Sequence, residues 1–228
     1  MCIRDSLHAI GDRAARVGVD ALEKVMDPGA GNPQGHTLAH LQVVHPDDQQ
    51  RIGQLGLYLA ITHAWAAPDR PYDLTVIPFI DEVSDDDLYR PDGYYMQNVY
   101  PSRSLVEAGG VLVGGSDAPV DDLSPRPFFN IAAGISRMNP DGDVLNAAET
   151  VDVHEMIAAY TINGARVMGH EDRVGSIEVG KRADLAVIDR NLLMLAEEGG
   201  FEAITSIIDT QVDLTVFDGA VIFERDGD

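Results

Sequence analysis

The stretch Val111-Leu112-Val113-Gly114-Gly115-Ser116-Asp117 decides the fold class of this 228-residue chain. A short, continuous apolar run that ends in polar residues is typical of a strand buried on both faces, as in a parallel sheet. The preceding residues 102–108 favour a helix, which Gly109-Gly110 would end. A helix followed at once by such a strand predicts one unit of an α/β fold, with Asp117 at the carboxyl end of the strand.

The same alternation of strand and helix extends along most of the chain. Residues 7–12 look like the end of a strand that enters a loop, and Asp12 can cap a helix running to about Met26. Further strands are expected at 37–41 and 57–61, and further helices from Pro46 and over 126–138 and 152–168. This rhythm predicts a parallel sheet covered by helices.

Two segments depart from that rhythm. Residues 65–98 show no clear periodicity and contain several prolines, which indicates a long excursion or lid, although residues 74–80 could form a short strand. From residue 171 onward the chain is glycine-punctuated and β-branched. Two strand candidates near its end flank Asp218-Gly219, a strong hairpin signal. We therefore expect a small antiparallel β module after the α/β part.

Composition limits the classes of function. The 38 acidic and 16 basic side chains give a net charge of −22, which disfavours nucleic-acid binding because such a surface repels phosphates. The sequence contains neither a signal peptide nor an apolar run of membrane-spanning length, so we expect a cytoplasmic protein without membrane contacts. A single cysteine excludes a disulfide framework and a thiolate zinc cluster. The excess of aspartate fits either a GC-rich genome or adaptation to high salt.

Three polar residues lie at the ends of strand candidates: His8, His40 and Asp117. In a β/α barrel these strand ends meet at one mouth, and imidazole and carboxylate groups are suitable ligands for zinc. Each residue alone has an ordinary structural interpretation, because a strand-end histidine or a turn aspartate needs no ligand. His63 follows another strand candidate and could bind substrate or orient a ligand. Trp65, in the excursion, could line a pocket or simply pack.

The motifs resemble those of one enzyme family. The stretch His8-Ala9-Ile10-Gly11-Asp12 resembles the His-Ala-x-Gly-Asp motif of amidohydrolase family 3, within the metal-dependent amidohydrolase superfamily. Residues 115–120 resemble its motif on the last barrel strand, and residues 175–185 resemble the return of the chain into its β-sandwich. The resemblance runs from about Leu7 to the end.

This resemblance implies an architecture and a set of boundaries. Residues 7–170 would form the C-terminal half of a TIM-type (β/α)8 barrel, strands 5–8, with the lid-like insertion at about 65–98. Residues 171–228 would form part of a small composite β-sandwich. Residues 1–6 resemble a non-native scar and are left out of the fold. The chain would then be a fragment that lacks the N-terminal half of the family's fold.

The resemblance also implies roles for the strand-end residues. His8 would be the metal ligand of the fifth barrel strand and His40 that of the sixth, while Asp117 would touch metal and move the proton of the attacking water. Ala39 departs from the family pattern, which usually has glutamate before the sixth-strand histidine. The family's first-strand His-x-His pair and its metal-bridging residue are absent, which truncation would explain.

The implied function is metal-dependent hydrolysis of carbon–nitrogen bonds other than peptide bonds, such as amides, in a small-molecule substrate. The cofactor would be one or two divalent ions, with zinc favoured, and the chain as given would be inactive. Two alternatives stay open: a deaminase or cyclic-amide hydrolase of the same superfamily, and a non-catalytic, degenerate barrel or binding module. The motifs leave the oligomeric state open.

Overall fold

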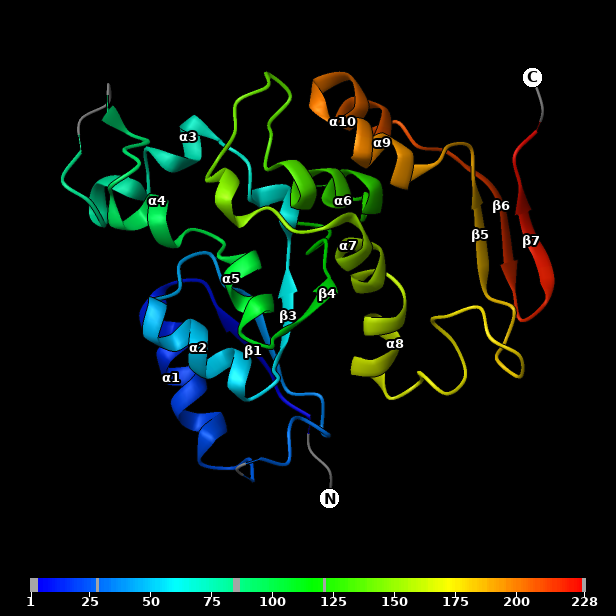
Figure 1. Cartoon of the computed structure of the whole chain (residues 1–228), viewed down its shortest axis with the longest axis horizontal. Helices are drawn as coiled ribbons and strands as arrows, with labels where there is room; N and C mark the ends of the chain where they lie inside the picture. Colours follow the sequence, from blue (N-terminus) through cyan, green and yellow to red (C-terminus); the bar gives the residue numbers. More distant parts are fainter. Residues whose placement is uncertain (1–3, 28, 84–86, 121, 227–228) are drawn as a thin grey trace.

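A computed structural model describes residues 4–27, 29–83, 87–120 and 122–226. Its first sheet is wholly parallel, with the strand order following the sequence. This sheet consists of β1 (Ser6–Ala9), β2 (Thr37–His40), β3 (Tyr58–Ile61) and β4 (Val111–Gly114). The strands therefore stand where the sequence predicts them. In Figure 1, β3 and β4 run through the middle of the molecule, with β1 beside them.

Helices connect and cover these strands. Those of the α/β part are α1 (Asp12–Glu23), α2 (Pro46–Gln54), α5 (Ser102–Glu107), α6 (Pro127–Ser136), α7 (Val153–Ala159) and α8 (Ile162–Met168). The first three lie together on one side of the sheet, whereas α7 and α8 pack against β4. The single helix expected over 152–168 is two helices, because the backbone of Thr161 leaves the helical region at φ −129° and ψ −98°.

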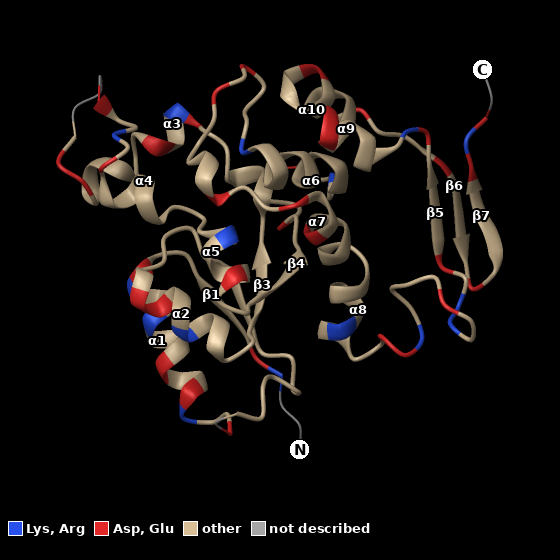
Figure 2. Ribbon diagram, in the orientation of Figure 1, with Lys and Arg blue, Asp and Glu red and all other residues tan. Residues whose placement is uncertain are grey.

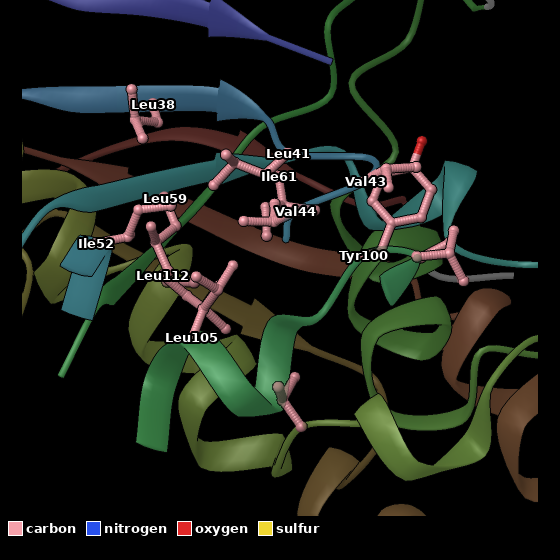
Figure 3. Close-up of a cluster of buried hydrophobic side chains, with 14 of the residues drawn as sticks. Leu38, Leu41, Val43, Val44, Ile52, Leu59, Ile61, Tyr100, Leu105 and Leu112 are labelled. Atoms are coloured by element: carbon pink, nitrogen blue, oxygen red, sulfur yellow. The ribbon is translucent and has the colours of Figure 1, made fainter. Parts of the chain in front are cut away.

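The core lies between the parallel sheet and its helices. Leu38, Leu59 and Leu112 occupy paired positions on three adjacent strands, and the side chain of each is fully buried. Figure 3 shows Leu59 and Leu112 close to Ile52 of α2 and Leu105 of α5. Burying aliphatic side chains in this way is the main stabilising contribution to folding, at roughly 25 cal/mol per Å² of apolar surface.

The excursion at 65–98 folds back over the carboxyl ends of the strands as short helical turns. These are η1 (His63–Trp65), α3 (Arg70–Asp73), η2 (Ile77–Phe79) and α4 (Tyr94–Asn98). The short strand considered for 74–80 is therefore wrong. Asp69 accepts a hydrogen bond from the backbone N–H of Tyr72 and caps α3, and Asp81 accepts from Tyr94 and Tyr95 and caps α4. These local caps favour helical turns over an extended strand.

The β module is a separate antiparallel sheet at one side of the molecule (Figure 1). It consists of β5 (Leu185–Ile188), β6 (Val212–Phe217) and β7 (Ala220–Glu224). The predicted hairpin is confirmed, because Asp218 and Gly219 join β6 to β7 with φ of 50° and 81°, as a two-residue turn of type I′ requires.

Some elements of the structure fall outside the sequence predictions. The sequence predicts none of the helices η4 (Ala147–Glu149), α9 (Leu192–Glu198) and α10 (Gly200–Ile208), and the last two lie within the stretch expected to form part of a β-sandwich. Of the predicted scar, residues 1–3 lie outside the described residues. Ser6 belongs to β1, and Arg4 donates a hydrogen bond to the Gln34 carbonyl. None of the described helices has the length and apolar character that crossing a bilayer demands.

Candidate metal centre

The two predicted histidine ligands face each other at the carboxyl edge of the parallel sheet. His8 lies in β1, and His40 is the last residue of the neighbouring β2. The Nδ1 atom of His8 lies 2.7 Å from the Nε2 atom of His40, and the ring centroids are 4.8 Å apart. The parallel register between β1 and β2 creates this contact between residues 32 positions apart.

The two imidazoles can supply part of the ligand set of a metal ion after a small movement. Two histidine nitrogens on one tetrahedral zinc ion would stand roughly 3.3 Å apart, given Zn–N bonds of about 2.0–2.1 Å. The observed separation is shorter and fits a hydrogen bond between the rings, so a small ring rotation is needed to admit an ion. Two imidazole nitrogens directed at one point are a suitable donor set for a divalent ion, and the residues therefore fit the metal in part.

Asp117 lies near the pair and not within it. It follows β4 and is partly exposed, and its negative charge partly opposes the lowering of the His40 pKa that burial causes. Within the described residues, no group of three His, Cys, Asp or Glu side chains lies close enough to hold a metal ion. The structure thus brings His8 and His40 together and leaves Asp117 as an electrostatic neighbour.

His40 is held in an unusual environment. Its backbone is left-handed, with φ of 72°, and its ring stacks on Trp65 with centroids 5.6 Å apart and planes inclined by 13°. Burial lowers the pKa of His40, and His8 lowers it further, so the neutral imidazole that binds metals is favoured. A non-glycine residue held at positive φ at a strand end is a strained position of the kind found at functional sites.

The other ring nitrogen of His40 lacks the partner that a ligating histidine usually has. Its Nδ1 atom is buried without a hydrogen-bond partner among the described residues. Metal-binding imidazoles generally donate this second N–H to a carboxylate or carbonyl group, which fixes the ring. Ala39 stands before His40, at the position where the amidohydrolase family that this sequence resembles usually has a glutamate. This substitution therefore coincides with a ring nitrogen of His40 that has no hydrogen-bond partner in the described part of the chain.

His63 occupies the interior. Its side chain is 1% exposed, and its Nε2 atom lies 3.2 Å from the hydroxyl oxygen of Ser102. Burial, together with the nearby charge of Arg137, lowers the pKa of His63 to about 3. Contact with a substrate would require neighbouring side chains to move. A role for His63 in substrate binding stays a prediction.

A cavity of about 840 Å³ lies close to the histidine pair, although neither imidazole belongs to its lining. Trp65, whose ring stacks on His40, is part of its wall, and so is Ile10, two residues beyond His8. Trp65 was a possible wall residue from the sequence alone. Four other aromatic residues line the cavity and were not predicted to do so: Tyr72, Tyr89, Tyr100 and Phe129. The aromatic content of the excursion was a signal for Tyr72 and Tyr89, whereas no local pattern indicated that Tyr100 and Phe129 would meet them.

Comparison with known proteins identifies related sequences. The sequence model of the amidohydrolase family matches residues 4–223. An N-substituted formamide deformylase of Arthrobacter pascens is 28% identical over 226 residues, which are 97% of this chain and 37% of that protein. The protein LONG AFTER FAR-RED 3 of Arabidopsis thaliana is 25% identical over 82% of this chain and 30% of its own length. A 5-methylthioadenosine/S-adenosylhomocysteine deaminase of Teredinibacter turnerae is 38% identical over 42% of this chain and 21% of its own length.

Solved structures of other proteins, among them a metal-dependent hydrolase and a dipeptidase, share the fold. An uncharacterized metal-dependent hydrolase of Pyrococcus horikoshii OT3 aligns with a TM-score of 0.61 and 21% identity, covering 87% of this chain and 36% of that one. A Xaa-Pro dipeptidase aligns with the same TM-score and 17% identity, over 98% and 45% of the two chains. The predicted fold class, half of a (β/α)8 barrel with part of a β-sandwich, is confirmed. The chain spans about a third of the length of the first two curated relatives named above.

Proposed function

This chain belongs to the amidohydrolase family, and we propose that it supplies one side of an active site that hydrolyses amide-type carbon–nitrogen bonds in small molecules. The observation that carries the proposal is the approach of His8 Nδ1 and His40 Nε2 to 2.7 Å, beside the charge of Asp117. Metal-dependent hydrolases among the structural neighbours support a divalent ion, and we favour zinc because the facing donors are imidazoles.

Each residue has one task in this proposal. A divalent ion, when bound, would polarise the carbonyl of the substrate and lower the pKa of water, so that water loses a proton more readily and becomes a better nucleophile. His8 and His40 would hold that ion through the nitrogens that face each other. Asp117 accepts the proton of the attacking water and delivers it to the departing nitrogen, which leaves as a neutral amine. Trp65 holds the His40 ring in place by stacking on it.

A second candidate is deamination by the same residues. The deaminase of Teredinibacter turnerae matches 42% of this chain at a higher identity than the formamide deformylase. Both reactions expel nitrogen after the attack of water on carbon, so His8, His40 and Asp117 would keep their tasks. The longer match, over 97% of this chain, favours amide hydrolysis.

The mechanism is tested with Asp117→Asn in a full-length protein that contains this chain and a complete barrel. We expect amide turnover to fall at least about a hundredfold while bound metal, measured by elemental analysis, is retained. The matched control is Asp213→Asn, a carboxylate of β6 in the other sheet. Full activity of the Asp117 variant would refute its role as the proton carrier.

The metal site is tested in the 228-residue chain itself. With two facing imidazoles and one nearby carboxylate, we expect at most one divalent ion, bound weakly, and no amide turnover. Equilibrium dialysis with zinc measures the stoichiometry, and His40→Ala should abolish the binding. Tight binding of two ions, or chelator-sensitive amidase activity of this chain, would contradict the proposed incomplete site.

A further inference from the structure

The cavity beside His40 is walled by aromatic rings. Aromatic residues make up 6% of the sequence, yet Trp65, Tyr72, Tyr89, Tyr100 and Phe129 all line this one space. They come from the excursion, from the residues before α5 and from α6, so segments distant in sequence converge here. Aromatic rings favour other rings through edge-to-face and offset stacking, in addition to the burial of apolar area.

Hydrogen bonds fix several of these rings in place. The hydroxyl of Tyr72 donates to Oε1 of Gln42 at 3.0 Å, and the hydroxyl of Tyr89 donates to Asp73 at 2.7 Å. Asp73 is buried, and burial raises its pKa. The Phe129 ring carries the guanidinium of Arg126 at 4.1 Å from its centroid. A wall whose side chains are held before a ligand arrives loses little entropy on binding.

The charges around the cavity discriminate against anions. Its lining contains three carboxylates, Asp69, Asp141 and Asp143, and one basic side chain, Arg70. The surrounding protein carries a net charge of −22. A ligand with a carboxylate would approach like charges, whereas an uncharged ring would meet no such repulsion.

We propose that this cavity receives an uncharged aromatic substituent of the substrate, so that the preferred substrate class is aromatic amides without an acidic group. The inference rests on the proposed function, because it places the amide at the His8–His40 pair with the aromatic substituent against Trp65, Tyr72 and Phe129. It adds the substrate class, which the family resemblance leaves open.

Binding of matched probes to the 228-residue chain tests this inference. Trp65 is the single tryptophan of the sequence and lies in the cavity wall, so its fluorescence reports occupancy directly. The probes are acetanilide, N-cyclohexylacetamide of similar size without an aromatic ring, and 4-acetamidobenzoate with an added carboxylate. We expect acetanilide to bind roughly fivefold more tightly than N-cyclohexylacetamide, the size of one aromatic contact. It should also bind more tightly than 4-acetamidobenzoate, because the added carboxylate is repelled by the acidic lining of the cavity. Ligand-observed NMR repeats the comparison independently of probe absorbance.

Wall variants locate the site. Phe129→Ala should weaken acetanilide binding roughly fivefold, given the typical strength of an aromatic pair. Tyr72→Leu, at a side chain exposed enough to tolerate change, should do the same. The control is Phe79→Ala, which removes an 87% exposed ring of the same excursion outside the cavity. Circular dichroism confirms that each variant is folded.

The outcomes separate this inference from the proposed function. Equal affinity for acetanilide and N-cyclohexylacetamide, or unchanged affinity in both folded wall variants, would overturn the aromatic substrate class. The titrations contain no metal, so zinc binding and turnover remain independent measurements. Acetanilide bound in the cavity by a protein that never binds zinc would support the pocket and refute the hydrolase.

Discussion

The two sheets of this molecule are built from similar residues and have opposite surroundings. In the parallel sheet, Leu38, Leu59 and Leu112 are fully buried beneath helices, whereas every residue of β7 is exposed, including Ile222 at 64%. Figure 1 shows the reason, because α1, α2 and α5 cover the first sheet while β5–β7 stand at the edge of the molecule. The proposed metal ligands His8 and His40 lie in strands of the covered sheet, whose packing can hold them in position.

Because groups buried near the helix-covered parallel sheet have shifted pKa values, we expect acid to lower the free energy of unfolding. The neutral His63 is buried there, and its pKa falls from 6.5 to about 3. The unfolded chain binds a proton below pH 6.5 and the folded chain does not, so stability decreases as pH falls from 6.5 toward 3. A shift of this size corresponds to ~5 kcal/mol at most. Asp73, whose pKa is raised by burial, opposes part of the loss.

Denaturant unfolding between pH 7 and pH 4.5 measures this effect in the original chain and in His63→Gln. The stability of the variant should decrease less steeply with falling pH, because the buried neutral His63 is gone. Some decrease should remain, because burial also lowers the pKa of His40. The slope is the relevant quantity, since the variant also changes the bond to Ser102. Identical slopes would show that His63 is not the buried neutral group that controls acid unfolding.

Truncation of one aliphatic side chain in each sheet compares their packing directly. Leu59→Ala in β3 should cost about 2–5 kcal/mol of the free energy of unfolding, because it leaves a cavity in a close-packed core. Ile222→Ala in β7 should cost less than about 1 kcal/mol, because the side chain faces solvent. Urea titrations of both variants measure the difference. Equal costs would mean that β7 packs against something in solution.

Salt should have the smallest effect. Asp and Glu are spread over both halves of the molecule (Figure 2), so screening should relieve repulsion and raise the melting temperature between low and molar sodium chloride. Arg51 opposes this trend, because its ion pairs with Asp20, Glu23 and Asp48 weaken in salt. Arg51→Gln should therefore steepen the rise. A melting temperature that stays constant or falls with salt would contradict adaptation to high salt and favour the GC-rich genome as the origin of the acidic composition.

Local sequence patterns predicted the elements whose signals are themselves local. Alternating apolar runs and helices located all four parallel strands, and Asp218-Gly219 located the hairpin. The helices α9 and α10 were missed within a stretch dominated by β signals. The excursion has no clear periodicity in the sequence, because caps from Asp69 and Asp81, rather than an apolar repeat, set its short helices.

The sequence by itself determined the family, the order of the strands and the three polar residues at strand ends. Only the tertiary structure decided that the imidazoles of His8 and His40 meet while Asp117 stays outside ligand distance, since this depends on strand register and on a left-handed turn after β4. It also buried His63 and gathered five aromatic rings around one cavity. Such contacts join residues that are far apart along the chain, and a local pattern carries no information about which distant surfaces will pack together.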